Sequence, residues 1–434
     1  MPAKALPGFR DFYPDDITLR NHILGTWRTV ATRYGFEEYD GPPLEPLDLY
    51  TQKSGAELVG QLYHFRDRGD REVALRPEMT PTLARMVAAR APALKKPIRW
   101  FSMPQLFRYE RQQRGRLREH FQLNMDLIGE PGPLADAEII AAALDVTRAL
   151  GFGPQDVRAR VSDRRVIRAL LASAGVPEAS VGAAFAAIDK IGREARTKLR
   201  DWLIEDGKLA PDVADRVLTA GEIRGLDAAC AALANVAEGR ELAQPLVECV
   251  GALRAMGLGD FVEVDLSIVR GLAYYTGIVF ELFDARQSLR AICGGGRYDG
   301  LLEVLGGTDL PAVGFGMGDV VLGELLKDTG RLPSAPASID VFLVAVTAAD
   351  LEAVLALAHE LRDRGMRVEF ALHEQSVAKQ LKLAAARRAT WAIVIGPDER
   401  QMGGAVLRNL ASGTEERLVM HALRERLASP SGRG

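Results

Sequence analysis

The amino-acid sequence predicts an α+β body that is interrupted by a helical insertion and followed by a separate α/β domain. Three observations predict this architecture. Strand and helix patterns mix up to residue 163 and return from about residue 261 to residue 326, whereas residues 164–250 repeat apolar positions at helical spacing. Beyond residue 338, strands alternate with helices. A chain of 434 residues, 47% of them hydrophobic, can form two or three domains with buried cores.

Composition limits the class of protein. Lysine and arginine against aspartate and glutamate give 55 − 58 = −3, which excludes a protein that coats a polyanion by bulk charge. No run of about 18 apolar residues is present to cross a membrane. The three cysteines are far apart and the six histidines lack zinc spacing. We therefore expect a cytoplasmic protein without disulfides or a structural metal.

The boundary between the two domains is predicted at residues 327–338, where proline, serine and glycine are concentrated. The following residues, 339–434, begin with a β-branched run and continue with two helices and two further strands. A hairpin and a last helix close the chain. Such alternation is typical of a mostly parallel sheet that is covered by helices on both faces.

The strongest chemical signal is a basic hairpin, FRYERQQRGRLREH, between two predicted strands. Its arginines are Arg108, Arg111, Arg114, Arg116 and Arg118. Guanidinium groups bind phosphates in a bidentate manner, although an exposed charged hairpin would show the same residues. The next strand alternates polar Gln122, Asn124 and Asp126 with apolar residues, so its polar face could form the wall of a pocket.

Two other stretches could bind parts of a substrate. In LRPEMTPTLARMV, Glu78 precedes a helix that starts near Thr80, where a carboxylate could take a substrate ammonium or simply cap the helix. In SIVRGLAYYTGIVFE, Arg270 interrupts an apolar strand pattern. Tyr274 and Tyr275 follow it, and they could line a site for a planar group or lie at the rim of a core strand.

Glycines are concentrated in two stretches near the end of the first domain. Three consecutive glycines precede Arg297, and Gly314, Gly316 and Gly318 alternate with apolar residues. The second stretch lacks the spacing and the βαβ unit of a dinucleotide site. We expect a flat ligand to lie against the backbone of this strand.

In their order and spacing, these stretches resemble the class II aminoacyl-tRNA synthetases and, among them, the histidyl-tRNA synthetase family. YGFEEYDGPPLE is similar to motif one, the basic hairpin with FQLNMDLIG to motif two, and RGLAYYTGIVFE to a stretch peculiar to this family. The resemblance implies a class II catalytic core, an antiparallel sheet flanked by helices, in residues 1–326. It implies an anticodon-binding domain in residues 339–434. The implied activity is that of a homodimeric histidine–tRNA ligase that uses L-histidine, ATP, Mg²⁺ and the tRNA for histidine, without a membrane.

The resemblance also implies roles for the matched residues. Arg108 and Arg270 would be catalytic, and Arg108 and Arg118 would bind ATP. The histidine site would consist of Glu78, Met79, Thr80, Arg108, Gln122, Asp126, Arg270, Tyr274 and Tyr275. No residue is assigned to a metal.

The sequence departs from the family pattern at two places. Ala273 stands where an acid is usual, so that Arg270 has no anion near it in the sequence and its partner is expected to be the substrate. Val320 and Val321 stand where motif three usually has a Glu-Arg pair, and that arginine holds the terminal phosphate of ATP. The expected substitutes are Arg111, Arg114 and Arg116 of the basic hairpin.

These departures leave an alternative function open. A synthetase-like protein without aminoacylation could regulate an ATP phosphoribosyltransferase or sense uncharged tRNA. The intact RGLAYYTG stretch and the C-terminal domain favour the synthetase over the regulatory subunit, and no kinase signature is present to support the sensor.

Overall fold

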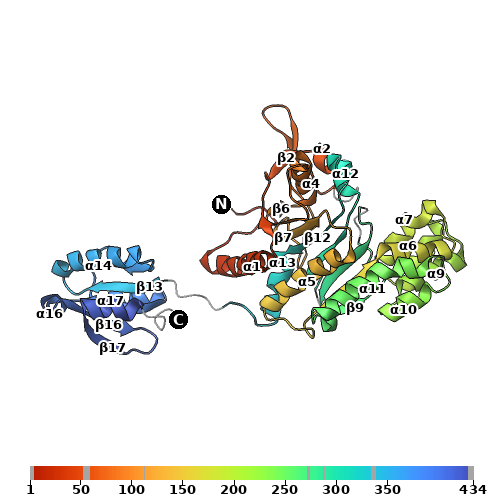
Figure 1. The fold of residues 1–434 in the computed structure, drawn as a ribbon. Helices are drawn as coiled ribbons and strands as arrows, with labels where there is room; N and C mark the ends of the chain where they lie inside the picture. The colour runs from red at the N-terminus through yellow and green to blue at the C-terminus, as the bar shows by residue number, and fades with distance from the viewer. Residues whose placement is uncertain are drawn as a thin grey trace. The chain divides into compact units, whose positions relative to one another are not determined.

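The computed structural model describes residues 4–51, 59–111, 113–270, 274–286, 289–333 and 339–428. The chain divides into two compact units, Met1–Pro333 and Ser334–Gly434, and each unit has its own buried core (Figure 1). Ala273 and residues 334–338 of the predicted linker lie outside the described residues.

The first unit is built on a nine-stranded sheet. Its strands are β1 Glu37–Glu38, β5 Ile98–Ser102, β6 Gln105–Phe107, β7 Glu119–Ile128, β8 Val157–Asp163, β9 Val262–Val264, β10 Ile278–Asp284, β11 Cys293–Arg297 and β12 Ala312–Gly318. Across the sheet they follow the order β1-β5-β7-β12-β11-β10-β8-β9, and β6 pairs with the start of β7. Among the described strands of this sheet, the two outermost pairs alone are parallel. The centre of the sheet is therefore antiparallel, as the resemblance implied.

One face of this sheet is covered by helices and forms the main core. These helices are α1 Pro14–Arg33, α5 Pro133–Ala149 and α13 Asp319–Asp328. The side chains of Leu123, Met125 and Leu127 point to this face, because alternate residues of a strand share a face, and they are buried against it. Helix α5 begins at Pro133, a position where the missing N–H of proline costs nothing.

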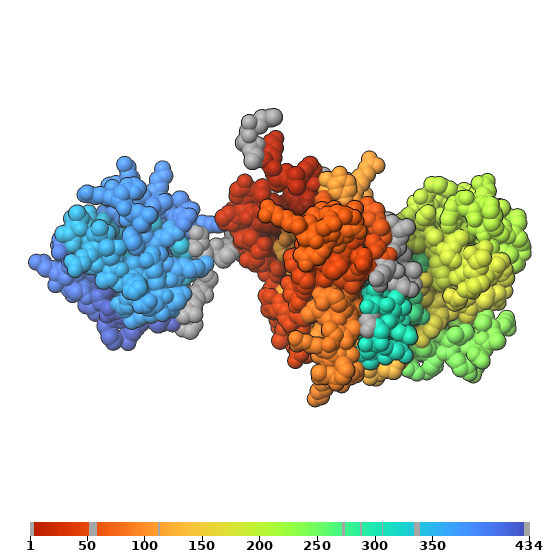
Figure 2. Space-filling view, turned by 90° about the horizontal axis from the view of Figure 1, so that it is seen from above, coloured from red at the N-terminus to blue at the C-terminus, as the bar shows by residue number. Residues whose placement is uncertain are grey.

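A set of helices leaves the sheet after β8 and returns to it at β9. They are α6 Arg164–Ser173, α7 Val181–Ile188, α8 Arg196–Glu205, α9 Pro211–Gly221, α10 Leu226–Ala232 and α11 Gly239–Ala255. Figure 2 shows this insertion, in yellow and green, as a lobe at one end of the first unit. Helix α11 packs against α5, so the core of the insertion is continuous with the core of the sheet.

The opposite face of the sheet is only partly covered. A small sheet of β2 Leu44–Pro46, β3 His64–Arg66 and β4 Glu72–Leu75 lies close to the helices α2 Asp48–Thr51, α4 Thr80–Arg90 and α12 Leu301–Gly306. Helices α4 and α12 pack together over a second apolar cluster that includes Ile98, Ile128 and Val279 of the large sheet. The rest of this face carries the polar residues described below.

The second unit is a five-stranded sheet with the order β14-β13-β15-β16-β17. Its elements are β13 Ile339–Ala345, α14 Leu351–Asp363, β14 Val368–Phe370, α15 Val377–Ala386, β15 Ala389–Ile395, α16 Pro397–Gln401, β16 Gly404–Asn409, β17 Glu415–Val419 and α17 Met420–Ala428. The first three strands are parallel and the last two form the predicted antiparallel hairpin. Helices α14 and α17 bury one face of the sheet, and α15 buries the other.

The sequence-based fold class agrees with this architecture, with one local error. The apolar pattern around Arg270 predicted a strand there, but β10 begins only at Ile278 and Arg270 lies in the loop before it. Within the described residues, no helix is both long and apolar enough to cross a membrane.

Candidate active site

The partly covered face of the large sheet is lined with glycines. Gly314 on β12 lies opposite Asp126 on β7, and Gly318 lies opposite Gln122. A methyl group added at Gly314 would overlap with the carboxylate of Asp126, and one added at Gly316 would lie 2.8 Å from Cδ of Gln122. The alternating glycines thus give the space in which these two polar side chains lie. The sequence predicted a flat ligand against the backbone of this strand, whereas in the structure the side chains of Asp126 and Gln122 lie against its glycines.

Gly294 on β11 likewise gives the space in which the guanidinium group of Arg270 lies. A methyl group at Gly294 would lie 2.9 Å from Nη2 of Arg270 and would overlap with Nη1. Arg270 has a φ angle of 57°, a left-handed conformation that is uncommon for a residue with a side chain. The bare backbone of Gly294 and this backbone conformation together direct the guanidinium group onto the sheet.

Arg270 has a protein partner, contrary to the expectation from its sequence neighbours. Its Nη1 donates to Oε1 of Glu281 on β10, and both side chains are 21% exposed. Glu281 lies opposite Gly294 in the strand register, which explains why an acid 11 residues away in the sequence reaches the arginine. The buried Nε of Arg270 has no hydrogen-bond partner among the described residues.

Asp126 is the buried acid of this face. Tyr298, which follows β11, donates its hydroxyl to Oδ1 of Asp126. Burial raises the pKa of Asp126 to about 7, because removal from water disfavours the carboxylate more than the Tyr298 hydrogen bond favours it. Near neutral pH this side chain can therefore either accept or donate a hydrogen bond.

The two predicted tyrosines lie beside these groups. The rings of Tyr274 and Tyr275 are 5.0 Å apart, and the ring of Tyr298 is 6.0 Å from that of Tyr274. The guanidinium carbon of Arg270 lies 6.0 Å from the centre of the Tyr275 ring. Burial raises the pKa of both tyrosine hydroxyls, so they remain neutral hydrogen-bonding groups. Aromatic rings with polar tips suit a planar substrate group that also needs hydrogen bonds.

The segment that precedes α4 approaches the same face. Glu78 is buried, Met79 is fully buried as the residue before the helix, and Thr80 is the first helical residue, as predicted. Met79, the N-cap residue of this helix, makes no side-chain cap hydrogen bond. Nε of Arg108 donates to the carbonyl oxygen of Pro77 at 2.8 Å, which ties the basic hairpin to this segment.

Within the basic hairpin the arginines have different partners. Arg118 lies 4.0 Å from the centre of the Tyr109 ring, and its Nε donates to the carbonyl of Glu110. Arg116 forms an ion pair with the carboxylate of Glu110. Arg114 binds both carboxylate oxygens of Asp328 on α13, at 2.6 and 2.8 Å. Arg114 and Arg116, two of the three arginines expected to replace the motif-three arginine, are therefore paired with protein carboxylates.

The sequence analysis missed several residues of this region. His120 on β7 lies among the arginines: burial first, and then Arg108, Arg10 and Arg116, lower its pKa to about 3, so its imidazole is neutral. Arg10 binds Glu119 at 2.6 Å and Asp319 at 2.8 Å. Nothing in the sequence placed Arg10 beside α13, because 309 residues separate it from Asp319.

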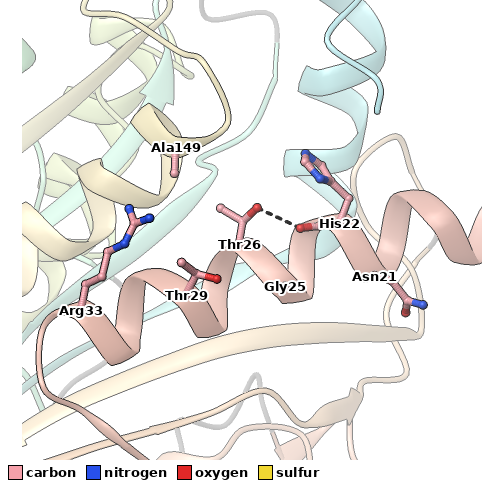
Figure 3. A pocket seen from close by; sticks show the side chains of 7 residues that line it. All are labelled: Asn21, His22, Gly25, Thr26, Thr29, Arg33 and Ala149. Carbon is pink, nitrogen blue, oxygen red and sulfur yellow. Dashed lines mark hydrogen bonds between the residues drawn. The ribbon is translucent and has the colours of Figure 1, made fainter. Parts of the chain in front are cut away.

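No cluster for a metal is present among the described residues: no three or more histidine, cysteine, aspartate or glutamate side chains are placed to hold one. A hollow of about 450 Å³ lies elsewhere on the unit (Figure 3). It is lined by Asn21, His22, Gly25, Thr26, Thr29, Arg33 and Ala149. Because most of these residues belong to α1, the hollow is separate from the candidate active site.

Known proteins match this chain over nearly all of its length. A family model described as histidyl-tRNA synthetase matches residues 8–318, and one described as an anticodon binding domain matches residues 340–429. The chain belongs to the histidyl-tRNA synthetase family. A histidine–tRNA ligase of Opitutus terrae is 46% identical over 95% of both chains. The chloroplastic/mitochondrial histidine–tRNA ligase of Arabidopsis thaliana is 40% identical over 94% of this chain and 83% of its own.

Solved structures agree on the fold. The crystal structure of histidyl-tRNA synthetase from Nostoc sp. PCC 7120 superposes with a TM-score of 0.83, at 24% identity, over 98% of this chain and 99% of the other. The family predicted from the sequence is confirmed, and so is the anticodon-binding domain. Membership in the histidyl-tRNA synthetase family also gives a context to the polar face: residues from both halves of motif two meet there with residues of the stretch that is peculiar to the family.

Proposed function

We propose that the protein is a histidine–tRNA ligase. It activates L-histidine with ATP to histidyl-adenylate and pyrophosphate, and then transfers the histidyl group to the 3′ end of its tRNA. The observation that carries this proposal is the meeting of Asp126, Gln122 and Arg270 on one glycine-lined face of the sheet. Relatives named histidine–tRNA ligase, which match over 95% and 83% of their own length, support it.

The residues divide by charge along this face. Gln122, Asp126, Tyr274 and Tyr275 bind the imidazole and polar groups of histidine, and Glu78 with Met79 and Thr80 forms the wall near its ammonium. Arg108 binds the α-phosphate, Arg118 contributes to the ATP site, and Arg270 stabilises charge that develops between carboxylate and phosphate. Little covalent chemistry is required of the protein, since alignment of the carboxylate with the α-phosphate supplies most of the rate.

Mg²⁺ enters with the substrate. The described residues do not form a protein cage for it, and magnesium usually retains waters and binds nucleotide phosphates through one or two carboxylates. Its contribution is to neutralise phosphate charge, and no step of the chemistry is assigned to a protein-bound ion.

The working form is a cytoplasmic homodimer that uses α1, the helix directly before the stretch that resembles motif one, at its interface. In Figure 3, Thr26 donates to the carbonyl of His22, and small and polar side chains line the hollow on this helix. Sedimentation of the purified protein tests this: a monomer at micromolar concentration would contradict it.

The alternative, a synthetase-like binding protein without aminoacylation, is separated by one assay. Exchange of labelled pyrophosphate into ATP that depends on histidine, together with charging of tRNA, supports the ligase. Binding of histidine or tRNA without pyrophosphate exchange and without tRNA charging would contradict the ligase and support the binding protein.

A further inference from the structure

Three neighbouring strands of the large sheet, whose loops are distant in the sequence, have ends at the same side of the sheet. β7 begins there at Glu119, β12 ends there at Gly318, and β11 begins there at Cys293. The register confirms it, because Cys293 lies opposite Met317, which itself lies opposite Leu123. The loop that leads into β11 therefore lies beside the exit of the basic hairpin and the first turn of α13.

The first turn of α13 offers no cation to a ligand at this edge. Val321 is buried, and a methyl group added at Gly115 of the basic hairpin would lie 3.2 Å from its Cγ2. Asp319 accepts hydrogen bonds from Arg10 at 2.8 Å and from the backbone N–H of Phe121 at 2.9 Å. A phosphate at this edge must find its counter-charge on another segment.

Arg290, in the loop before β11, carries the positive charge that a phosphate would need, and no described residue pairs with it. It is exposed, and it makes no hydrogen bond or ion pair with any residue that the structure describes. Partial burial of its guanidinium group, and then the charge of Arg116, lower its pKa, whereas the charge of Glu110 raises it. Arg116 forms an ion pair with Glu110 and Arg193 forms one with Asp189, whereas Arg290 forms none among the described residues.

The basic hairpin connects this end of the strands to the candidate active site. In the hairpin, Oε1 of Glu110 lies 4.0 Å from Nη1 of Arg108, and the carboxylate of Glu110 binds Arg116. Arg108 also approaches the Glu78 segment. A polyphosphate that is bound at its first phosphate by Arg108 would extend along the hairpin toward the loop that carries Arg290.

We propose that Arg290 binds the terminal phosphates of ATP, the task that Val321 cannot perform. This inference rests on the proposed function. ATP is preferred over the tRNA backbone as the source of the phosphate because the loop of Arg290 leads into β11 beside the end of β12, where the first turn of α13 places Val321. A guanidinium group suits this task, since it binds phosphate in a bidentate manner and does not lose its charge.

The test uses the full-length protein and two matched variants, Arg290→Gln and Arg286→Gln. Arg286 is a second exposed arginine of the same loop and serves as the control. Hydrogen bonds to charged groups change affinity by about ten- to a hundredfold, so Arg290→Gln should raise the KM for ATP in pyrophosphate exchange without tRNA by roughly that factor. The KM for histidine and the affinity for AMP should change by less than about twofold, and Arg290→Lys should recover part of the loss.

Three outcomes would overturn the inference. They are an ATP KM of Arg290→Gln equal to that of Arg286→Gln, equal weakening of ATP and AMP binding, and an effect on tRNA charging alone. The last outcome would assign the arginine to an RNA phosphate. If the parent protein shows no histidine-dependent exchange, the proposed function fails. Calorimetric binding of ATP against AMP to the same variants then still tests the phosphate contact.

Discussion

Gly294 gives the sharpest test of how the candidate active site is built. In Gly294→Ala, the new methyl group would lie 2.9 Å from Nη2 of Arg270 and closer to Nη1. Carbon and nitrogen atoms in contact need about 3.5 Å, so the guanidinium group must move by roughly 1 to 1.5 Å. A misplacement of this size costs up to about 10² in rate, which corresponds to about 2.7 kcal/mol of barrier.

The fold should tolerate this change, because the obstructing atoms are the end of a long, flexible side chain. Gly295→Ala provides the contrast: its methyl group would lie 2.8 Å from the Cα of Phe315 and would overlap with the carbonyl oxygen of Gly314. The strands β11 and β12 would have to separate, so this variant should be destabilised by about 1–3 kcal/mol or more. Thermal melting separates the two effects, and pyrophosphate exchange measures the first.

A double-mutant cycle decides whether the loss in Gly294→Ala acts through Arg270. Arg270→Ala should lower the exchange rate by about 10²–10³, as removal of one preorganised donor does. Adding Gly294→Ala to that variant should change little further, since residues that act together are not additive. The reasoning is refuted if Gly294→Ala retains the parent rate, or if it causes the same loss when Arg270 is already absent.

Three further outcomes are expected. Asp126→Asn should raise the free energy of unfolding by up to about 4 kcal/mol above pH 7 and leave it unchanged near pH 4, as urea unfolding at a series of pH values can measure. The reason is that the pKa of Asp126 is about 7 in the folded protein, so ionisation of this buried carboxyl group opposes folding as the pH rises. Arg297→Met should destabilise the first unit by about 3–5 kcal/mol by leaving Asp136 buried without its partner, and Asp136→Asn in the same chain should recover much of the loss. A chain that ends at Pro333 should still form histidyl-adenylate but lose most tRNA charging; unimpaired charging would contradict the anticodon-reading role of the second unit.

The sequence predicted the parts of the site that depend on local period and composition. Alternation along β7 placed Gln122 and Asp126 on one face, and the strands on either side of the basic hairpin follow from their apolar patterns. The start of α4 at Thr80 follows from its proline. These features depend on neighbours within a few residues, which a single sequence contains.

The remaining features depend on contacts between distant segments. Glu281 reaches Arg270 because the guanidinium group lies over Gly294, which is opposite Glu281 in the sheet. Tyr298 reaches Asp126 across a separation of 172 residues. The glycines were noticed, but the sequence could not show whether a ligand or a side chain fills the space above them. Spacing alone does not show which loops meet at one end of the strands, so the sequence did not indicate a role for Arg290.

The order of polar groups along β7 explains how one strand could contact both ATP and histidine. His120, among the arginines, and Asp126, the buried acid, are six residues apart on the same face, which corresponds to roughly 20 Å of extended strand. Arginines with a neutral imidazole at one end favour phosphates, whereas a carboxylate with a pKa near 7 at the other end favours a hydrogen-bond donor. Gln122 lies between them, where carboxylate and α-phosphate would meet. For the proposed ligase, a substrate bound in the reverse direction would place its phosphates against Asp126, so we expect this strand to select the direction of binding.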